Sequence, residues 1–461
     1  MDPVPSACRR EIAEDSNWTG RTTEAFDPGG KTQAFARIVT HLGWIVGGKG
    51  YGAILSLLYL ALLTRTLGVE AYGSFALILS STLILQALLN FNIWQVLVKY
   101  GHEHIHRGDA VGLARLIRFC TIADLAMATM SLLLAALLLY FGANLFGLAP
   151  DLVLPTLAYA GIFLFSIRNV PRGVLRLHSQ FSWAFFAEAV VPTLKMLGCL
   201  AAYFTDPSLP AFLLIWAGSE MASTLVFWWL ACRSFRLAHG KVSARHWMLA
   251  WSENDGLPSL LFASNFGTVT YTVTQQLPVL LVGFFAGASE VGLYRLANQV
   301  AQSITLLAGF VSLASYTEMA NAHAREGIRG VIVLYTRLTK IMLLLFLVVV
   351  PIVILLGKPV LLLISGQEFA GAYPFLVILS LAACLQMATA NCEPMLMASG
   401  RAGSLIVIRL AGAAALIVAM YAMVPAMGAI GAAWAKLVAE AFGLLLLFGA
   451  SLGILREGKS S

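Results

Sequence analysis

Nine ionisable side chains lie inside long apolar stretches of this sequence. They are the cations Lys49, Lys195, Arg295, Arg409 and Lys436, and the acids Asp124, Glu188, Glu220 and Glu440. A charge at the centre of a bilayer costs about 2.5–3.5 kcal/mol on insertion scales, so such residues mark ion pairs, water-filled cavities or the path of a polar substrate. A low dielectric also strengthens the contact between a cation and a phosphate group. These residue types therefore indicate binding of a charged substrate.

The first apolar stretch contains the strongest single candidate. Gly47, Gly48, Gly50 and Gly52 surround Lys49. Glycines weaken a helix enough to let it bend, and they leave space around a neighbouring side chain. Close packing against another helix would explain the glycines but not the lysine. We therefore expect Lys49 to contact a substrate.

A second candidate group lies on one stripe of a later helix. Glu188, Pro192 and Lys195 are spaced at i, i+4 and i+7, and proline can kink such a helix. Two roles remain open for the stripe: Glu188 neutralises Lys195, or Lys195 binds substrate directly. Glu220, in the next apolar stretch, is a further candidate for charge pairing or for coupling to an ion.

Uncharged polar side chains form two further rows at helical spacing. One row follows Arg295, and the other lies on one face just before Pro278. Their members are Asn298, Gln299 and Gln302 in the first row, and Asn265, Thr268, Thr272 and Gln275 in the second. Amides and hydroxyls at this density can bond to sugar hydroxyls, although threonine often bonds only to its own helix backbone.

The elements that carry these residues are predicted to be membrane helices. Of the 461 residues, 59% are hydrophobic and only 11% charged, whereas about a quarter of a soluble domain is charged. The mean hydropathy is +0.81. A helix needs about 20 apolar residues to cross a bilayer, and these stretches are too long for barrel strands. Twelve spans are predicted, at residues 38–63, 73–97, 119–142, 152–170, 183–204, 210–231, 258–283, 291–315, 337–357, 374–397, 403–424 and 428–453.

Basic residues predict the orientation of these spans. With both termini in the cytoplasm, 23 of the 30 Lys and Arg fall in cytoplasmic segments, and only Arg65 and Lys358 fall in outside connectors. The predicted organisation is a disordered cytoplasmic tail (1–37), a six-helix lobe (38–232), a cytoplasmic linker (233–256), a second six-helix lobe (257–453) and a cytoplasmic tail (454–461). Because cytoplasmic loops account for the basic residues, the pI of 9.1 does not indicate nucleic-acid binding.

Other groupings have structural explanations. Lys436 and Glu440 at i, i+4 are expected to pair with each other. His102 and His106 share a helix face, but they lack the order of a zinc motif and lie in a mixed-charge connector. The six cysteines form no CxxC pair. No metal, cofactor or disulfide is predicted.

Two turns in the sequence are related by an internal repeat. Gly68 and Gly73 in the first outside turn, and Gly287 and Gly292 in the fourth, both follow the pattern G-x4-G-x-aromatic, 219 residues apart. That offset spans six helices, and an even number of crossings makes the repeats parallel. The simpler explanation is two tight turns that each need glycine.

These turns carry a resemblance to a known family. The sequence Leu63-Thr64-Arg65-Thr66-Leu67-Gly68, followed by Tyr72-Gly73, and the later sequence Val291-Gly292-Leu293-Tyr294-Arg295-Leu296-Ala297 are similar to the turns of polysaccharide flippases. Those proteins belong to the multidrug, oligosaccharidyl-lipid and polysaccharide exporter superfamily. The resemblance implies an all-α polytopic membrane protein whose two parallel six-helix repeats surround a central cavity with alternating access.

The resemblance also implies a substrate, a location and partners. The substrate would be a polyprenyl-diphosphate-linked oligosaccharide for O-antigen or exopolysaccharide synthesis, flipped across a bacterial inner membrane. Membrane lipids, a polysaccharide polymerase and the chain-length machinery are the expected partners. The residues expected to contact substrate are Lys49, Arg65, Lys195, Thr268, Gln275, Arg295 and Arg409, with Glu188 and Glu220 in coupling or charge pairing.

Two rival functions make different demands on the sequence. A drug or organic-cation antiporter of the same fold is expected to carry a carboxylate in the first or seventh span, and neither stretch contains one. A membrane-embedded polysaccharide-processing enzyme needs a chemical site in a sizeable outside loop or an intramembrane His/Asp group. The outside connectors are short and contain no histidine. Transport is therefore preferred to catalysis.

Overall fold

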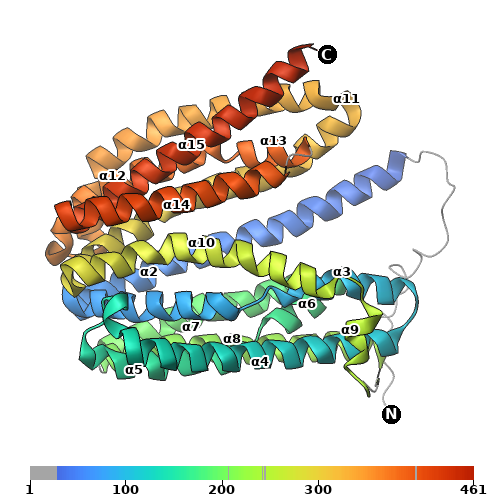
Figure 1. Cartoon of the computed structure of the whole chain (residues 1–461), viewed down its shortest axis with the longest axis horizontal. Helices are drawn as coiled ribbons and strands as arrows, with labels where there is room; N and C mark the ends of the chain where they lie inside the picture. The colour runs from blue at the N-terminus through green and yellow to red at the C-terminus, as the bar shows by residue number, and fades with distance from the viewer. Residues whose placement is uncertain (1–27, 206, 241, 243–244, 400–401, 461) are drawn as a thin grey trace. The chain divides into compact units, whose positions relative to one another are not determined.

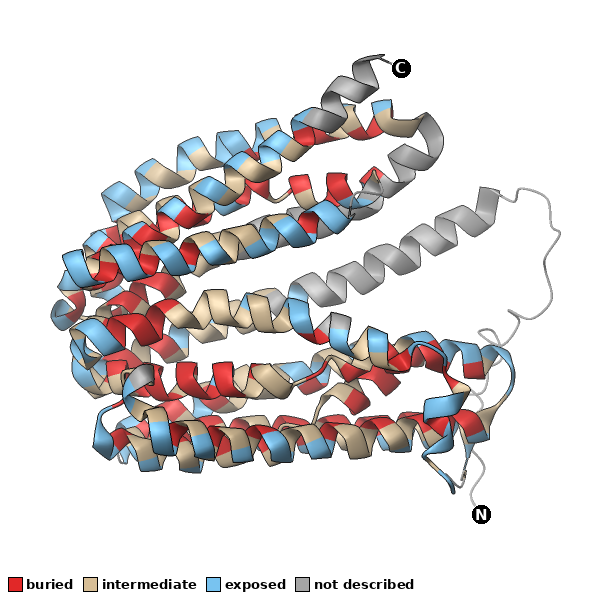
Figure 2. Cartoon of the chain, in the orientation of Figure 1, coloured by how far each residue is buried: buried red, intermediate tan, exposed pale blue. Residues whose placement is uncertain are grey.

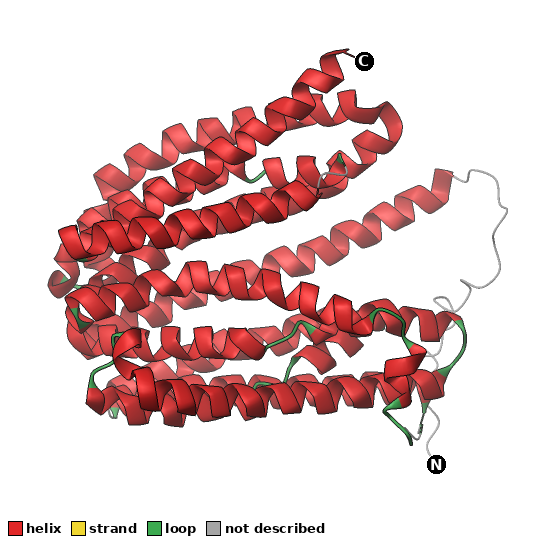
Figure 3. Cartoon of the chain, in the orientation of Figure 1, coloured by secondary structure: helices red, strands yellow, loops and turns green. Residues whose placement is uncertain are grey.

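The computed structural model describes residues 28–460 apart from 206, 241, 243–244 and 400–401. Side chains are described from residue 50 to 452, with further gaps at 145, 263–264, most of 306–326, 398 and 402. The chain divides into two compact units, residues 1–47 and 48–461, and the second is the subject below. Every regular element in the described part is helical, as predicted (Figure 3).

The N-terminal half of the chain consists of antiparallel helices joined by short turns (Figure 1). Its elements are α2 (Pro28–Leu89), α3 (Ile93–His106), α4 (Ala110–Gly142), η1 (Ala143–Phe146), α5 (Pro150–Ala160), η2 (Gly161–Phe165), α6 (Asn169–Leu177), α7 (Phe181–Phe204) and α8 (Leu209–His239). α2 begins at Pro28, within the segment 1–37 that was predicted to be a tail, and residues 1–27 lie outside the described part.

The C-terminal half repeats the helical pattern after a short connector. Its elements are α9 (Leu249–Glu253), α10 (Leu257–Ala286), α11 (Ala288–Ser365), η3 (Gln367–Ala372), α12 (Tyr373–Thr389), α13 (Cys392–Ala398), α14 (Ala402–Met427) and α15 (Ala429–Ser460). α10 begins at the residue where the second lobe was predicted to begin.

Two glycines divide the longest helices into separate spans. Gly68 in α2 and Gly327 in α11 have φ values of 73° and 64°, a backbone region that glycine adopts without steric cost. Ten stretches of described residues are long and apolar enough to cross a membrane. One of them, from Gly50 to His106, contains the predicted span 73–97 and part of the predicted span 38–63. The predicted span 291–315 includes residues whose side chains are not described. The structure therefore agrees with a polytopic membrane protein.

Apolar side chains are distributed as a membrane environment requires. The largest cluster of buried apolar residues includes both halves, with Phe75 from α2 and Tyr294 from α11 among its members. A second cluster around Leu97 consists of residues of the N-terminal half together with Leu257 of α10, and a third around Tyr335 belongs to the C-terminal half. Many large apolar side chains on the spans are exposed, for example Leu355 at 74% (Figure 2). Such surfaces suit contact with lipid tails.

The two repeated turns contact each other reciprocally. Gly68 and Gly287 both have positive φ, at 73° and 84°, where each turn enters a helix. The second glycine of each motif allows close backbone approach: a Cβ on Gly73 would overlap the carbonyl oxygen of Ala288, and a Cβ on Gly292 would overlap that of Val69. Val69 and Ala288 are themselves 219 residues apart. The glycines therefore serve an interface between the repeats, which two independent tight turns would not require.

Candidate functional site

The N-terminal half contains a cluster of two cations and one acid, of which Lys195 is buried and the other two are partly buried. Glu220 on α8 accepts a hydrogen bond from Lys195 on α7, with 2.9 Å between Nζ and Oε1. Its other oxygen, Oε2, lies 2.6 Å from Nη2 of Arg168. Lys195 is only 8% exposed, and its ammonium lies 5.1 Å from the ring centroid of Trp216. The three side chains together carry a formal charge of about +1 at neutral pH.

Local backbone features bring these three side chains together. Arg168 comes from an interruption at residues 166–168, between η2 and α6, so its side chain is not committed to a helix face. α7 contains Pro192 one turn before Lys195, and the ring of a proline removes one backbone hydrogen bond. Arg168 was not among the predicted site residues, because it lies at the end of the predicted span 152–170 and was counted with the cytoplasmic basic residues.

Of the two roles left open for the stripe on α7, neutralisation of Lys195 by Glu188 does not occur in the structure. Glu188 instead lies beside Arg172 of α6, at 3.5 Å between Oε1 and Nε, and is 53% exposed. Residues at i and i+7 are separated by about 10.5 Å along a helix, so their side chains reach neighbouring helices more readily than each other. Lys195 pairs with Glu220, which was one of the residues proposed for charge pairing.

A polar cavity of about 220 Å³ is lined by residues of the C-terminal half together with Ser56 of α2. Side-chain amides dominate its walls, from Gln275 on α10, from Asn298, Gln299 and Gln302 on α11, and from Gln386 on α12. Gln302 donates to Gln275, with 3.0 Å between Nε2 and Oε1. All three amides of the predicted row on α11 therefore line this cavity, whereas Gln275 alone represents the predicted row on α10. Asn265 of that row instead donates to the carbonyl of Leu88. Gln386 was missed because it belongs to no row of polar residues at helical spacing within the predicted span 374–397.

Lys436 and Glu440 of α15 also line this cavity, and they do not pair as predicted. Lys436 donates to Asn298, with 2.8 Å between Nζ and Oδ1. The ammonium thus reaches across to α11 instead of along its own helix. The two charged side chains still cancel formally within one cavity, so the walls present amide and hydroxyl groups without a net charge.

Each of the three arginines among the predicted site residues has a partner in the structure. Arg65 donates from Nε to the carbonyl of Ile364 at 3.0 Å and from Nη2 to that of Leu363, near the C-terminus of α11. Arg295 donates to Gln276 Oε1 at 3.1 Å. Arg409 forms an exposed ion pair with Glu393, at 2.8 Å.

The remaining predicted residues lie apart from the cation cluster. Thr268 of α10 accepts a hydrogen bond from Asn92, at the interruption between α2 and α3. Arg65 and Arg409 donate to a helix end and to an exposed acid, which are structural contacts. Lys49 belongs to α2, and its side chain lies outside the described part.

His102 and His106, noted in the sequence for their i, i+4 spacing, lie one turn apart on α3. The rings of His102 and His106 are 6.5 Å apart, and no group of three metal-ligating residues occurs among the residues described. A different histidine has an unusual environment: His178 Nδ1 lies 2.9 Å from Ser234, and its Nε2 lies 3.3 Å from that of His239. Burial and the neighbouring imidazole lower the pKa of His178 to about 4.

Comparison with known proteins identifies the family. Residues 38–323 match the family described as Polysaccharide biosynthesis protein. The chain belongs to this family. The Escherichia coli (strain K12) inner membrane protein YghQ is 21% identical over 348 residues, which cover 74% of this chain and 96% of YghQ. This membership confirms the family resemblance that was predicted from the repeated turns.

Two solved membrane transport proteins share the fold. An inward-facing multidrug resistance MATE family transporter of the MOP superfamily has a TM-score of 0.70 at 16% identity, over 89% of this chain and 96% of that chain. The lipid II flippase MurJ, in an inward closed conformation, has a TM-score of 0.67 at 14% identity, over 88% of this chain and 86% of that chain. These identities are low, so the likeness concerns the fold alone.

Proposed function

We propose that this polysaccharide biosynthesis protein flips polyprenyl-diphosphate-linked oligosaccharides across the inner membrane by alternating access. The single observation that carries the proposal is the cluster of Lys195, Arg168 and Glu220, in which two cations share one carboxylate. A diphosphate has about two negative charges, and charge-assisted hydrogen bonds to it are strengthened where water is excluded.

The cluster supports exchange of partners during transport. Glu220 satisfies both cations while the site is empty, which avoids leaving a buried positive charge unpaired. An entering diphosphate offers more oxygen acceptors and more charge than one carboxylate, so it competes for Lys195 and Arg168. Release of the substrate restores the original pairs. We infer that Glu220 lowers the cost of the empty state.

The amide-lined cavity supports recognition of the glycan. Gln275, Gln299, Gln302 and Asn298 provide both donors and acceptors, the combination that sugar hydroxyls require. The cavity's formal charge is zero, because Lys436 and Glu440 offset each other. We therefore assign the diphosphate to the cation cluster and part of the sugar to the cavity. The polymerase and chain-length machinery, as partners on the outer side, belong to the same proposal.

The test is restoration of export in a deletion strain. The strain should accumulate lipid-linked glycan in the inner leaflet, where intact spheroplasts protect it from an impermeant lectin. The wild-type gene should restore lectin binding. Lys195→Met should lower it about tenfold or more, since a lost charge-assisted contact is worth about 1.5–3 kcal/mol. Lys195→Met leaves Glu220 paired with Arg168, so the variant keeps no unpaired buried charge.

The matched control is Arg107→Gln, which removes a cation that is 67% exposed. Its Nη2 lies 3.7 Å from Oε2 of Glu103, a long and exposed ion pair. It should restore export as the wild type does. Full export by a normally abundant Lys195→Met variant would refute the role of the cluster. A deletion strain with no accumulated lipid-linked glycan, but with increased sensitivity to organic cations, would favour the rival antiporter.

A further inference from the structure

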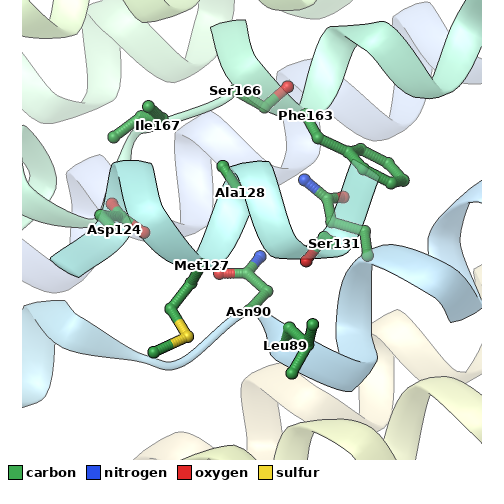
Figure 4. Close-up of a pocket in the computed structure, with 10 residues that line it drawn as sticks. Leu89, Asn90, Asp124, Met127, Ala128, Ser131, Phe163, Ser166 and Ile167 are labelled. Carbon is green, nitrogen blue, oxygen red and sulfur yellow. The ribbon is translucent and has the colours of Figure 1, made fainter. Parts of the chain in front are cut away.

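A small polar pocket lies within the N-terminal half, away from the amide-lined cavity. Asp124 and Ser131 on α4, spaced at i and i+7, line it together with Asn90, Ser166 and Gln86. The pocket holds about 20 Å³, and a single water-sized species needs roughly 10–15 Å³ on the same measure. Figure 4 shows the side chains of Asp124, Asn90, Ser131 and Ser166 gathered around this space.

Two membrane spans are interrupted beside the pocket. The helical pattern is broken at residues 90–92, between α2 and α3, and again at residues 166–168, between η2 and α6. Asn90 and Ser166 come from these interruptions, and both line the pocket. In transporters, interrupted helices release backbone carbonyls and position side-chain oxygens around small cations. The backbone here has that arrangement on two sides of Asp124.

Asp124 is incompletely compensated. The side-chain amide of Asn169 approaches three acceptors: Asn90 Oδ1 at 2.9 Å, Phe91 O at 3.2 Å and Asp124 Oδ1 at 3.2 Å. That amide has only two hydrogens to share among them. Asp124 is 5% exposed, and its Oδ2 accepts no hydrogen bond from any described residue.

The second unpaired group faces the same space. Ser131 is fully buried, lines the pocket, and its hydroxyl also has no hydrogen-bond partner among the described residues. Arg168, which follows the pocket residues Ser166 and Ile167, is held by Glu220. Cys120, one turn before Asp124 on α4, is a buried thiol and supplies no positive charge. One pocket is therefore lined by a buried carboxylate oxygen and a buried hydroxyl that both lack a hydrogen-bond partner among the described residues.

We propose that this pocket binds a single Na⁺ ion. The available donors are all oxygens, from a carboxylate, hydroxyls and side-chain amides, which are the ligands of hard cations. The presence of one carboxylate favours a monovalent ion, because divalent sites gain affinity from additional ligand charge. The ion would neutralise Asp124 and hold the two interrupted spans against α4. This site is separate from the proposed substrate site, so it does not depend on the identity of the glycan.

The test is Na⁺-dependent thermal stability of the full-length protein purified in detergent. Melting temperatures are measured in increasing NaCl at constant ionic strength, with choline chloride as the balancing salt and a parallel KCl series. Na⁺ should raise the melting temperature of the wild type with saturation, because it binds only the folded state. Asp124→Asn should abolish the shift, and Ser131→Ala should raise the half-saturating Na⁺ concentration about tenfold.

Ser380→Ala is the matched control, since Ser380 on α12 is also a buried serine without a described partner but lies outside the pocket. It should respond to Na⁺ as the wild type does. The proposal fails if Na⁺ and K⁺ stabilise the wild type equally, or if Asp124→Asn keeps the Na⁺ response. It also fails if stability depends on pH through Asp124 without any Na⁺ response, which would assign a proton to the site.

Discussion

Replacing Glu220 by glutamine should destabilise the protein more than removing either of its partners. Glu220 joins Lys195 at 2.9 Å and Arg168 at 2.6 Å, and the three side chains are 19%, 10% and 24% exposed respectively. Breaking a buried ion pair by removing one partner costs about 3–5 kcal/mol, because the other charge remains buried and unpaired. Glu220→Gln leaves two such cations, so we expect a loss of at least about 3 kcal/mol.

The single cation variants should be milder. Lys195→Met and Arg168→Gln each remove one charge-assisted hydrogen bond, worth about 1.5–3 kcal/mol, while Glu220 keeps its other partner. The double variant Glu220→Gln with Lys195→Met should be more stable than Glu220→Gln alone, since one unpaired ammonium is gone. Coupling between contacting residues is typically about 0.5–3 kcal/mol.

The assay is thermal unfolding in detergent, followed by tryptophan fluorescence, and the result is the rank order of melting temperatures. We expect the wild type to be highest, the two cation variants next, then the double variant and finally Glu220→Gln. If Lys195→Met melts as low as Glu220→Gln, Glu220 does not serve both cations. A double variant less stable than Glu220→Gln would also refute the reasoning.

Three further predictions address packing, pH and orientation. Gly73→Ala should strongly lower the melting temperature, because the added Cβ would overlap the carbonyl of Ala288, whereas Gly443→Ala, with open space around it, should be neutral or slightly stabilising. The free energy of unfolding should decrease as the pH is lowered from about 6.5 to about 4, because the pKa of His178 is lowered to about 4 in the folded protein and the unfolded chain binds the proton first. His178→Gln should reduce that loss. In a cysteine-free background, a cysteine replacing exposed Glu70 should react with an impermeant thiol reagent from outside, and one replacing exposed Arg107 should not.

Each of these predictions has a contradicting outcome. Equal melting temperatures for the two glycine variants would mean that the repeated turns do not pack as closely as the backbone indicates. A His178→Gln variant with an unchanged loss of stability below pH 6.5 would assign that loss to other groups. Reversed labelling at positions 70 and 107 would invert the orientation predicted from the basic residues.

The sequence alone determined the architecture. Long apolar stretches have one stable structure in a bilayer, because every backbone polar group must be satisfied within the segment. Hydropathy therefore predicted the helices of this chain, and the 219-residue repeat predicted related turns. The positive φ at Gly68 and Gly287 agrees with that repeat. The sequence also indicated where polar chemistry would occur, since charges in apolar stretches are costly enough to require a reason.

Only the tertiary structure decided which polar groups meet. Helical spacing relates residues on one helix, so it suggested Glu188 with Lys195 and Lys436 with Glu440. The long side chains instead reach neighbouring helices, where Lys195 finds Glu220 and Lys436 finds Asn298. Arg168 entered the cluster through an interruption in a span that hydropathy treats as continuous. Contacts between helices depend on how the helices rotate and pack against one another, and periodicity within a single helix contains no information about that packing.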